Sequence, residues 1–281
     1  MCPVAVVTDS TATLPQEQVQ KYNIHVVPLY INWDGKRYRD GIDIKTEEFY
    51  ERLSQSRTLP TTSGATQGEF LQIFESLRGK VDGIAVFVVS SELSAAYNSA
   101  IIARELVADI PVEIIDTRIS TMAMGFGVMA AAKTASAGGN MKDVITAART
   151  IFDKAYFFFV LDTLDYLRRG GRVNFPAAVI ANLLKVKPIL TLKEGKVIPL
   201  ARPRTRAKAL DSLLSLMRKR ATTETPLHVA VMHGNDPEGV NYLKREITSR
   251  FNCAEFFITG FTPVMGAHTG PGLLGIAFYN E

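Results

Sequence analysis

The sequence predicts an α/β fold in two domains: an N-terminal three-layer domain over residues 1–155 and a smaller C-terminal α+β domain over 156–281. The first half alternates apolar strands with helices, a pattern typical of a parallel sheet covered by helices on both faces. The second half is less regular and contains a hairpin pattern. Because no long linker separates the halves, we expect the domains to pack closely and a ligand to bind between them.

Apolar runs and helical spacing define the elements of the N-terminal half. The run over 84–89 is almost purely apolar, as expected for a strand buried on both faces. Apolar side chains from Phe70 to Leu77 recur at helical spacing. The predicted strands cover residues 4–8, 24–31, 84–89 and 112–115, and the predicted helices cover 16–22, 66–77, 94–106, 122–134 and 141–152.

The C-terminal half mixes a hairpin with further strands and helices. Glu194-Gly195 separates two apolar segments and predicts the turn of the hairpin. Gly170-Gly171 ends a short helix. The predicted strands cover 156–161, 186–192, 196–200, 227–232, 255–259 and 274–279, and the predicted helices cover 164–169, 205–220 and 238–251.

Composition indicates a soluble, folded protein. Hydrophobic residues make up 47% and charged residues 21% of the chain, which excludes a disordered protein. No uncharged apolar run reaches the roughly 18 residues of a membrane span, so we expect no stable membrane insertion. The first ten residues lack the basic region of a signal peptide. With only Cys2 and Cys253, a disulfide framework is not expected, and we predict a cytoplasmic location.

Positive charge is concentrated in one part of the chain. The net charge is +4, but residues 160–220 contain 14 Lys/Arg and four Asp/Glu, a local charge of +10. This block is either a solvated surface or a surface for an anionic ligand or an acidic partner. Aromatic residues do not alternate with these charges, so we expect no nucleic-acid partner.

Polar clusters interrupt the apolar segments at four places: 8–11, 61–64, 90–94 and 116–118. Three of them directly follow predicted strands, whereas the 61–64 cluster leads into a helix. The carboxyl ends of parallel strands form one edge of a sheet, where ligands bind and where free amides at helix starts can hold an anion. Simple helix capping explains any single cluster equally well.

A histidine near the C-terminus is surrounded by backbone-shaping residues. Three glycines and a proline lie within Gly266–Gly272 around His268, and we expect this backbone to present the imidazole for function. The other histidines are scattered singly and the cysteines are far apart, so no metal site is predicted. The sequence contains no Walker motif, no dinucleotide fingerprint and no G-x-S-x-G elbow, so we expect no resident cofactor.

Nine segments, in order along nearly the whole chain, resemble the DegV family, which includes the fatty-acid-binding subunits of bacterial fatty acid kinase. They are VAVVTDSTATLP at 4–15, YRDG at 38–41, TTSGATQGEF at 61–70, SSELSAAYNSA at 90–100, IDTRISTMAMG at 115–125, LDTLDYLRRGGRV at 161–173, LLKVKPILTLKEGKV at 183–197, RPRTRAKAL at 202–210 and GAHTGPGLLGIAF at 266–278.

The resemblance implies a DegV-type fold and a bacterial lipid carrier rather than an enzyme. A long-chain fatty acid such as palmitate, stearate or oleate would lie buried between the domains, with Thr62, Ser94 and His268 around its carboxylate. A separate catalytic subunit, related to dihydroxyacetone kinase, would phosphorylate the carboxyl group, since this chain has no ATP site. Arg172 and Arg204 resemble the family's arginines that matter for work with that kinase.

The sequence departs from the family pattern near the expected ligand. Gly64-Ala65 stands where Gln-Pro is usual, Glu92 and Ala95 replace two glycines of the third cluster, and Ala96 replaces its threonine. In the fourth cluster, Thr121 and Ala123 stand where Ser and Gly are common. Because Thr62, Ser94 and His268 are retained, we expect these changes to alter chain preference rather than head-group binding.

Two other classes of function remain open at this point. Ser94 and His268 could act as nucleophile and base in acyl transfer or hydrolysis, although a third, orienting acid is not identified. Alternatively, the basic block over 160–220 could bind a regulatory partner.

Overall fold

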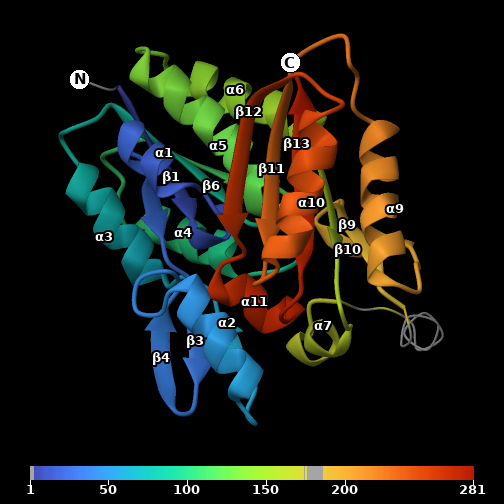
Figure 1. Ribbon diagram of the computed structural model, residues 1–281. Helices are drawn as coiled ribbons and strands as arrows, with labels where there is room; N and C mark the ends of the chain where they lie inside the picture. Colours follow the sequence, from blue (N-terminus) through green and yellow to red (C-terminus); the bar gives the residue numbers. More distant parts are fainter. Residues whose placement is uncertain (1–2, 174, 176–185) are drawn as a thin grey trace. The chain divides into compact units, whose positions relative to one another are not determined.

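The computed structural model describes residues 3–173, 175 and 186–281 (Figure 1). Cys2 and the beginning of the 183–197 segment lie outside the described residues. The chain forms two compact units. The first contains the chain up to Tyr30 together with Ser63–Asp153, and the second contains Ile31–Thr62 together with Lys154–Glu281.

The first unit contains a four-stranded sheet in the order β2-β1-β6-β7. All of its neighbouring strands are parallel, which confirms the parallel sheet expected from the alternating pattern. The strands are β1 (Val4–Asp9), β2 (His25–Val27), β6 (Gly83–Val88) and β7 (Val112–Asp116). Every residue of β1 and β6 is buried, as the apolar run over 84–89 indicated.

Helices cover both faces of this sheet and give it three layers. On one face, α5 (Thr121–Ser136) and α6 (Met141–Lys154) share a hydrophobic core with Val6 and Phe87. On the other face, α4 (Ala96–Glu105) contacts β6 and β7 and packs against α3 (Gln67–Leu77). The 3-10 helix η1 (Ser10–Ala12) and α1 (Gln16–Lys21) follow β1.

The second unit is built on a mixed six-stranded sheet in the order β10-β9-β8-β13-β11-β12. Only β11 and β12 are parallel, and the other pairs are antiparallel. The predicted hairpin is confirmed, because Glu194 and Gly195 both have positive φ angles and connect β9 to β10. The strands are β8 (Tyr156–Val160), β9 (Ile189–Lys193), β10 (Lys196–Ala201), β11 (Leu227–His233), β12 (Cys253–Gly260) and β13 (Leu274–Asn280).

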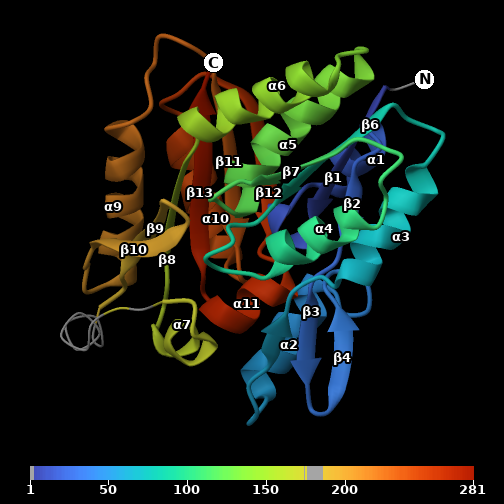
Figure 2. The ribbon, with the colours of Figure 1, turned by 180° about the vertical axis from the view of Figure 1, so that it is seen from behind.

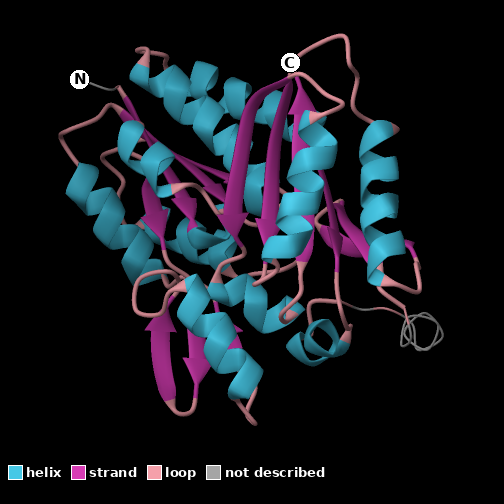
Figure 3. Cartoon of the chain, in the orientation of Figure 1, coloured by secondary structure: helices cyan, strands magenta, loops and turns pink. Residues whose placement is uncertain are grey.

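One face of the mixed sheet is covered by α9 (Arg206–Arg218) and α10 (Pro237–Thr248), as Figure 3 shows. Their apolar sides share a core with Val160, Val229 and Ile276 from the strands. Two shorter helices, α7 (Asp165–Gly170) and α11 (Pro263–Thr269), contact each other. Among the described residues, no helix is long and apolar enough to cross a membrane.

The segment 31–62 groups with the second unit, unlike the division of the chain at residue 155 expected from the sequence. It contains β4 (Lys36–Arg39) and α2 (Thr46–Gln55), all but the first residue of β3 (Tyr30–Trp33) and all but the last residue of β5 (Thr61–Ser63). The three strands form a small sheet in the order β4-β3-β5. With this segment, the second unit contains more residues than the first. The segment's helix α2 packs against α11, more than two hundred residues later in the chain.

The single strand predicted over 24–31 is wrong. The structure contains two strands there, β2 in the parallel sheet and β3 in the small sheet, separated by Pro28-Leu29. Proline lacks the N–H that a central strand needs, so it interrupts the hydrogen-bond ladder and allows the chain to change sheets. Pro28 was the sequence signal for this break.

Candidate functional site

The short helix α11 carries His268 in its last turn. The glycine-rich segment around His268 is therefore helical as far as Thr269, and within it only Gly270 and Gly272 have positive φ angles. The buried carboxylate of Asp40 accepts a hydrogen bond of 3.0 Å from the Val264 N–H at the beginning of the helix. This contact satisfies one of the free N–H groups and places a negative charge at the positive end of the helix dipole.

Two other helices of the second unit hold α11 from the sides. α11 lies between α2 and α7 in both views of the ribbon (Figures 1 and 2). A side chain at Gly266 would lie 2.6 Å from the Phe49 ring of α2, so the glycine allows a close helix contact. An isolated helix of seven residues is unstable in water, and these contacts therefore determine where His268 lies.

The structure joins Thr62 of β5 to His268. The Thr62 Oγ1 atom lies 2.7 Å from the His268 Nε2 atom, although the two residues are 206 positions apart in the chain. Burial lowers the pKa of His268 to about 4, and the charge of Arg172 lowers it further in the same direction. The imidazole is therefore neutral at pH 7.

The surroundings of the ring decide which nitrogen carries the proton. Among the described residues, the buried Nδ1 atom has no hydrogen-bond partner. A lone pair on Nδ1 is favoured by the nearby positive charge of Arg172, whereas an N–H there would be buried without an acceptor. We therefore assign the proton to Nε2, from which it is donated to Thr62 Oγ1. The Thr62 hydroxyl can then donate its own proton to an acceptor such as a ligand oxygen.

Arg172 and Arg204 have different surroundings within the second unit. Arg172 follows α7, is half-buried, and donates from Nη1 to the carbonyl of Gly170 at 2.8 Å. Burial lowers the pKa of its guanidinium. Arg204 is exposed and precedes Thr205, the N-cap residue of α9. The structure thus places Arg172 near His268 and Arg204 on the surface.

Ser94 belongs to the first unit, at the beginning of α4. Its hydroxyl accepts a hydrogen bond of 3.2 Å from the Ala96 N–H, which is a capping contact. A side chain at Gly64 would lie 3.3 Å from Ser94 Oγ, so the glycine leaves room beside the hydroxyl. The unusual Gly64 therefore faces the loop in which Ala95 replaces the usual glycine. The role of Ser94 in carboxylate binding stays a prediction.

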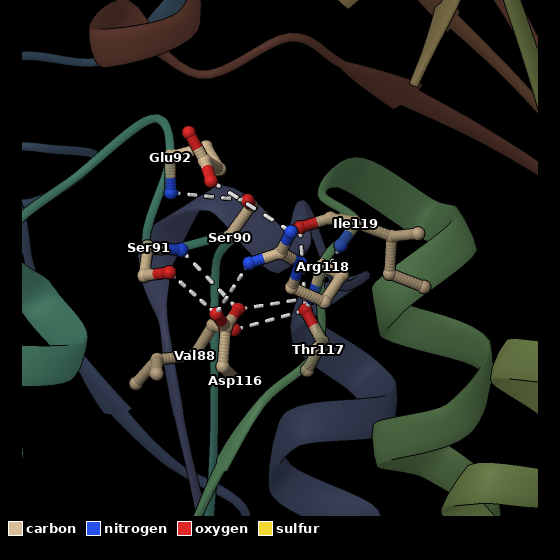
Figure 4. A network of polar contacts seen from close by, with 8 residues as sticks. All are labelled: Val88, Ser90, Ser91, Glu92, Asp116, Thr117, Arg118 and Ile119. Carbon is tan, nitrogen blue, oxygen red and sulfur yellow. Dashed lines mark hydrogen bonds and ion pairs between the residues drawn. The ribbon is translucent and has the colours of Figure 1, made fainter. Parts of the chain in front are cut away.

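The polar clusters after β1, β6 and β7 lie at one edge of the parallel sheet, as predicted. The buried Asp9 carboxylate accepts hydrogen bonds from the N–H groups of Thr11 and Val89 and so links two of the loops. Burial raises the pKa of Asp9. At the next pair of loops, Ser91 donates to Asp116, as Figure 4 shows.

Glu92, one of the departures from the family pattern, takes part in the same network. Arg118 forms ion pairs with Glu92 at 3.7 Å and with Asp116 at 3.6 Å (Figure 4). These contacts connect the loop that precedes Ser94 to the end of β7. Most of the clustered polar groups therefore order the loops. Among the described residues there is no group of three or more His, Cys, Asp or Glu that could hold a metal ion.

The protonation of His268 argues against the acyl-transfer alternative. A general base works best when its pKa lies near the working pH. With a pKa of about 4 and Nε2 engaged by Thr62, His268 is a weak base at neutral pH. Its geometry fits a neutral hydrogen-bond donor better than a catalytic base.

Comparison with known proteins identifies the family. The family model described as "Uncharacterised protein, DegV family" matches residues 3–281. The chain belongs to the DegV family. The DegV protein of Bacillus subtilis is 34% identical over 276 residues, which cover 98% of each chain.

Solved structures of DegV proteins share the fold. The crystal structure of Bacillus subtilis DegV, described as a fatty acid binding protein, has a TM-score of 0.92 and covers 99% of each chain. A fatty-acid-binding DegV family protein from Thermus thermophilus has a TM-score of 0.93 at 29% identity, with 99% of this chain and 100% of that chain covered. A stearic-acid-binding protein from Eubacterium ventriosum has a TM-score of 0.90 at 26% identity, with 99% and 98% covered.

The sequence did not reveal the role of Asp40, although it lies in the YRDG segment that resembles the family. Nothing local shows that its carboxylate would meet a helix 224 positions later. Because Asp40 lies between basic Arg39 and apolar Ile44, this part of the sequence resembles a turn on the surface of the protein. Its burial was the missing information.

The lowered pKa of His268 predicts a specific pH dependence of stability. Between pH 6.5 and about 4, the unfolded chain takes up a proton at His268 that the folded chain excludes, so stability falls as the pH falls through this range. Between pH 7 and pH 4, we expect the free energy of unfolding to fall less in His268→Asn than in the wild type, by up to about 3 kcal/mol. Urea unfolding at both pH values, without added ligand, measures the difference. Parallel losses in the two proteins would contradict the buried, neutral imidazole.

Proposed function

We propose that this protein binds a long-chain fatty acid and that Thr62 and His268 hold its carboxyl group. The observation that carries the proposal is the 2.7 Å contact between Thr62 Oγ1 and His268 Nε2, with an imidazole that stays neutral at pH 7. Further support comes from the family, because DegV proteins with the same fold are described as fatty-acid-binding.

The pair suits a carboxylate that must remain accessible to chemistry. With Nε2–H donating to Thr62 Oγ1, the Thr62 hydroxyl donates to a ligand oxygen, and the charge of Arg172 favours an anion nearby. A direct bidentate Arg–carboxylate pair would hold the head group more tightly and would occupy both of its oxygens. Neutral donors orient the carboxylate while leaving an oxygen available. We propose Ser94 as a further donor.

Most of the affinity would come from the tail. Each buried methylene contributes about 0.8 kcal/mol, so a chain of about 15 methylenes supplies on the order of 12 kcal/mol before the entropic costs of binding. The head-group contacts then set orientation more than affinity. Loss of the pair is therefore expected to weaken retention of the ligand without abolishing it.

We also propose that the bound fatty acid is presented to a separate kinase subunit. In that step the kinase transfers a phosphoryl group from ATP to a carboxylate oxygen, and an acyl phosphate and ADP are formed. The positive block around Arg204 supports this proposal, because Arg204 is exposed and available to an acidic partner surface. Arg172 is half-buried, so its effect on the kinase step would be exerted near the head group.

Mass spectrometry of an organic extract of the purified, denatured protein tests fatty acid binding. We expect a near-stoichiometric fatty acid in the wild type and a several-fold lower amount in His268→Ala. His228→Gln is the matched control, because His228 lies at the beginning of β11, the opposite end from His233 and α11. A protein that is empty and does not take up added fatty acid would refute the proposal. An equal load in wild type and His268→Ala would refute only the role of His268.

The kinase proposal is tested with Arg204→Glu. We expect the variant to retain its fatty acid load but to lose at least ten-fold in acyl phosphate formation when mixed with a fatty acid kinase catalytic subunit and ATP. Lys219→Glu makes the same charge change at the other end of α9 and serves as the control. Equal rates for Arg204→Glu and the wild type would show that this arginine does not contact the kinase.

A further inference from the structure

We infer that Gly170 is a positioning residue for His268: the absence of a side chain at the end of α7 provides the space that the imidazole occupies. A Cβ atom at Gly170 would lie 2.2 Å from His268 Nδ1, 3.1 Å from Cε1 and 3.3 Å from Cγ. The first distance is far below any real Cβ contact. One edge of the imidazole therefore lies directly against the backbone of α7.

The requirement for glycine at this position is steric. Gly170 does not have a positive φ angle, so its backbone conformation is open to any residue. Its neighbour Gly171 shows the opposite case, because it has a φ of 67° and a Cβ atom there would meet nothing within 4 Å. Gly171 is the left-handed residue that ends α7. The two adjacent glycines thus serve different purposes.

The face of α7 that carries Gly170 also packs against α11 one helical turn earlier. A side chain at Gly270 would lie 2.4 Å from the ring of Tyr166, which is four residues before Gly170 on α7. Residues four apart lie on the same face of a helix. The two helices therefore interlock at two points, a Tyr166–Gly270 contact and a Gly170–His268 contact. A shift of α7 that made room for a side chain at position 170 would therefore also disturb the Tyr166–Gly270 contact.

Gly170 fixes a second group through its carbonyl oxygen, which accepts a hydrogen bond from Arg172 Nη1 at 2.8 Å. A residue that moved α7 away from His268 would move this carbonyl and the guanidinium with it. The Thr62 contact on the opposite side of the ring, at Nε2, would be broken as the imidazole rotates away. The consequence for ligand binding rests on the proposed function, whereas the position of His268 does not.

A double-mutant cycle with Gly170→Ala and His268→Ala tests the inference. We expect Gly170→Ala to lower the midpoint of thermal unfolding in the wild-type background and to have little effect in the His268→Ala background, because the colliding ring has been removed. A merely structural glycine would lower the midpoint equally in both backgrounds, and that result would overturn the inference. If Gly170→Ala alone does not fold, a folded double variant supports the inference and an unfolded one overturns it.

The second measurement is the ¹⁵N NMR spectrum of the His268 imidazole. We expect both ring nitrogens to shift in Gly170→Ala, or in its folded fraction, and to keep their positions in Gly171→Ala, which strains the backbone without touching the ring. Unchanged nitrogen shifts in Gly170→Ala would contradict the inference. The fatty acid load separates the two proposals, since an empty wild-type protein would refute the proposed function and leave the result of the cycle unaffected.

Discussion

The hydrogen bond between Thr62 and His268 is the contact on which the arrangement of the candidate site in the second unit depends. A largely buried imidazole, with one nitrogen that has no partner among the described residues, is unfavourable unless its other nitrogen is satisfied and its charge is suppressed. Thr62 satisfies Nε2, and burial with the nearby Arg172 keeps the ring neutral. The surrounding elements hold this pair in place: Asp40 at the beginning of α11, Gly170 against the ring, and α2 along the side of the helix.

The position of the segment 31–62 follows from the same constraint. It supplies the Asp40 carboxylate, the aromatic surface of α2 and Thr62, and all three meet α11. The segment leaves the N-terminal part of the chain after β2 and returns to it through β5. A segment of about thirty residues thus gives the C-terminal helix contacts that a helix of seven residues needs in order to be stable. Separation along the sequence is no obstacle, because loop-closure entropy grows slowly with loop length.

Local patterns in the sequence were sufficient for most of the elements, but they did not show which partners the residues of the candidate site would contact. The apolar run over 84–89 and the turn Glu194-Gly195 each contain the information for the element they form. Thr62 and His268 were singled out in separate motifs, yet nothing in either motif shows that they share a hydrogen bond. Ser94 was also singled out, and its hydroxyl accepts a hydrogen bond from the Ala96 N–H at the beginning of α4. Helix capping explains this contact.

The features that the sequence did not reveal have one physical cause. Asp40 looks like a turn residue until its burial is known, and Gly170 looks like a helix terminator until the imidazole beside it is known. The helix α11 is too short to show helical periodicity. Each depends on a neighbour distant in sequence. Pro28 is different, since its missing N–H was a local signal for the division between β2 and β3.

The most direct test of how the head group is held is ¹³C NMR of carboxyl-labelled palmitate bound to the protein, recorded as a pH titration. A carboxylate that accepts the Thr62 hydroxyl proton is stabilised in its ionised form, so its pKa should lie below that of fatty acid bound to Thr62→Val, and its resonance should differ in the two proteins. The His228→Gln control should match the wild type. Identical chemical shifts and titration curves for palmitate bound to wild type and to Thr62→Val would contradict the central claim that the Thr62–His268 pair holds the head group.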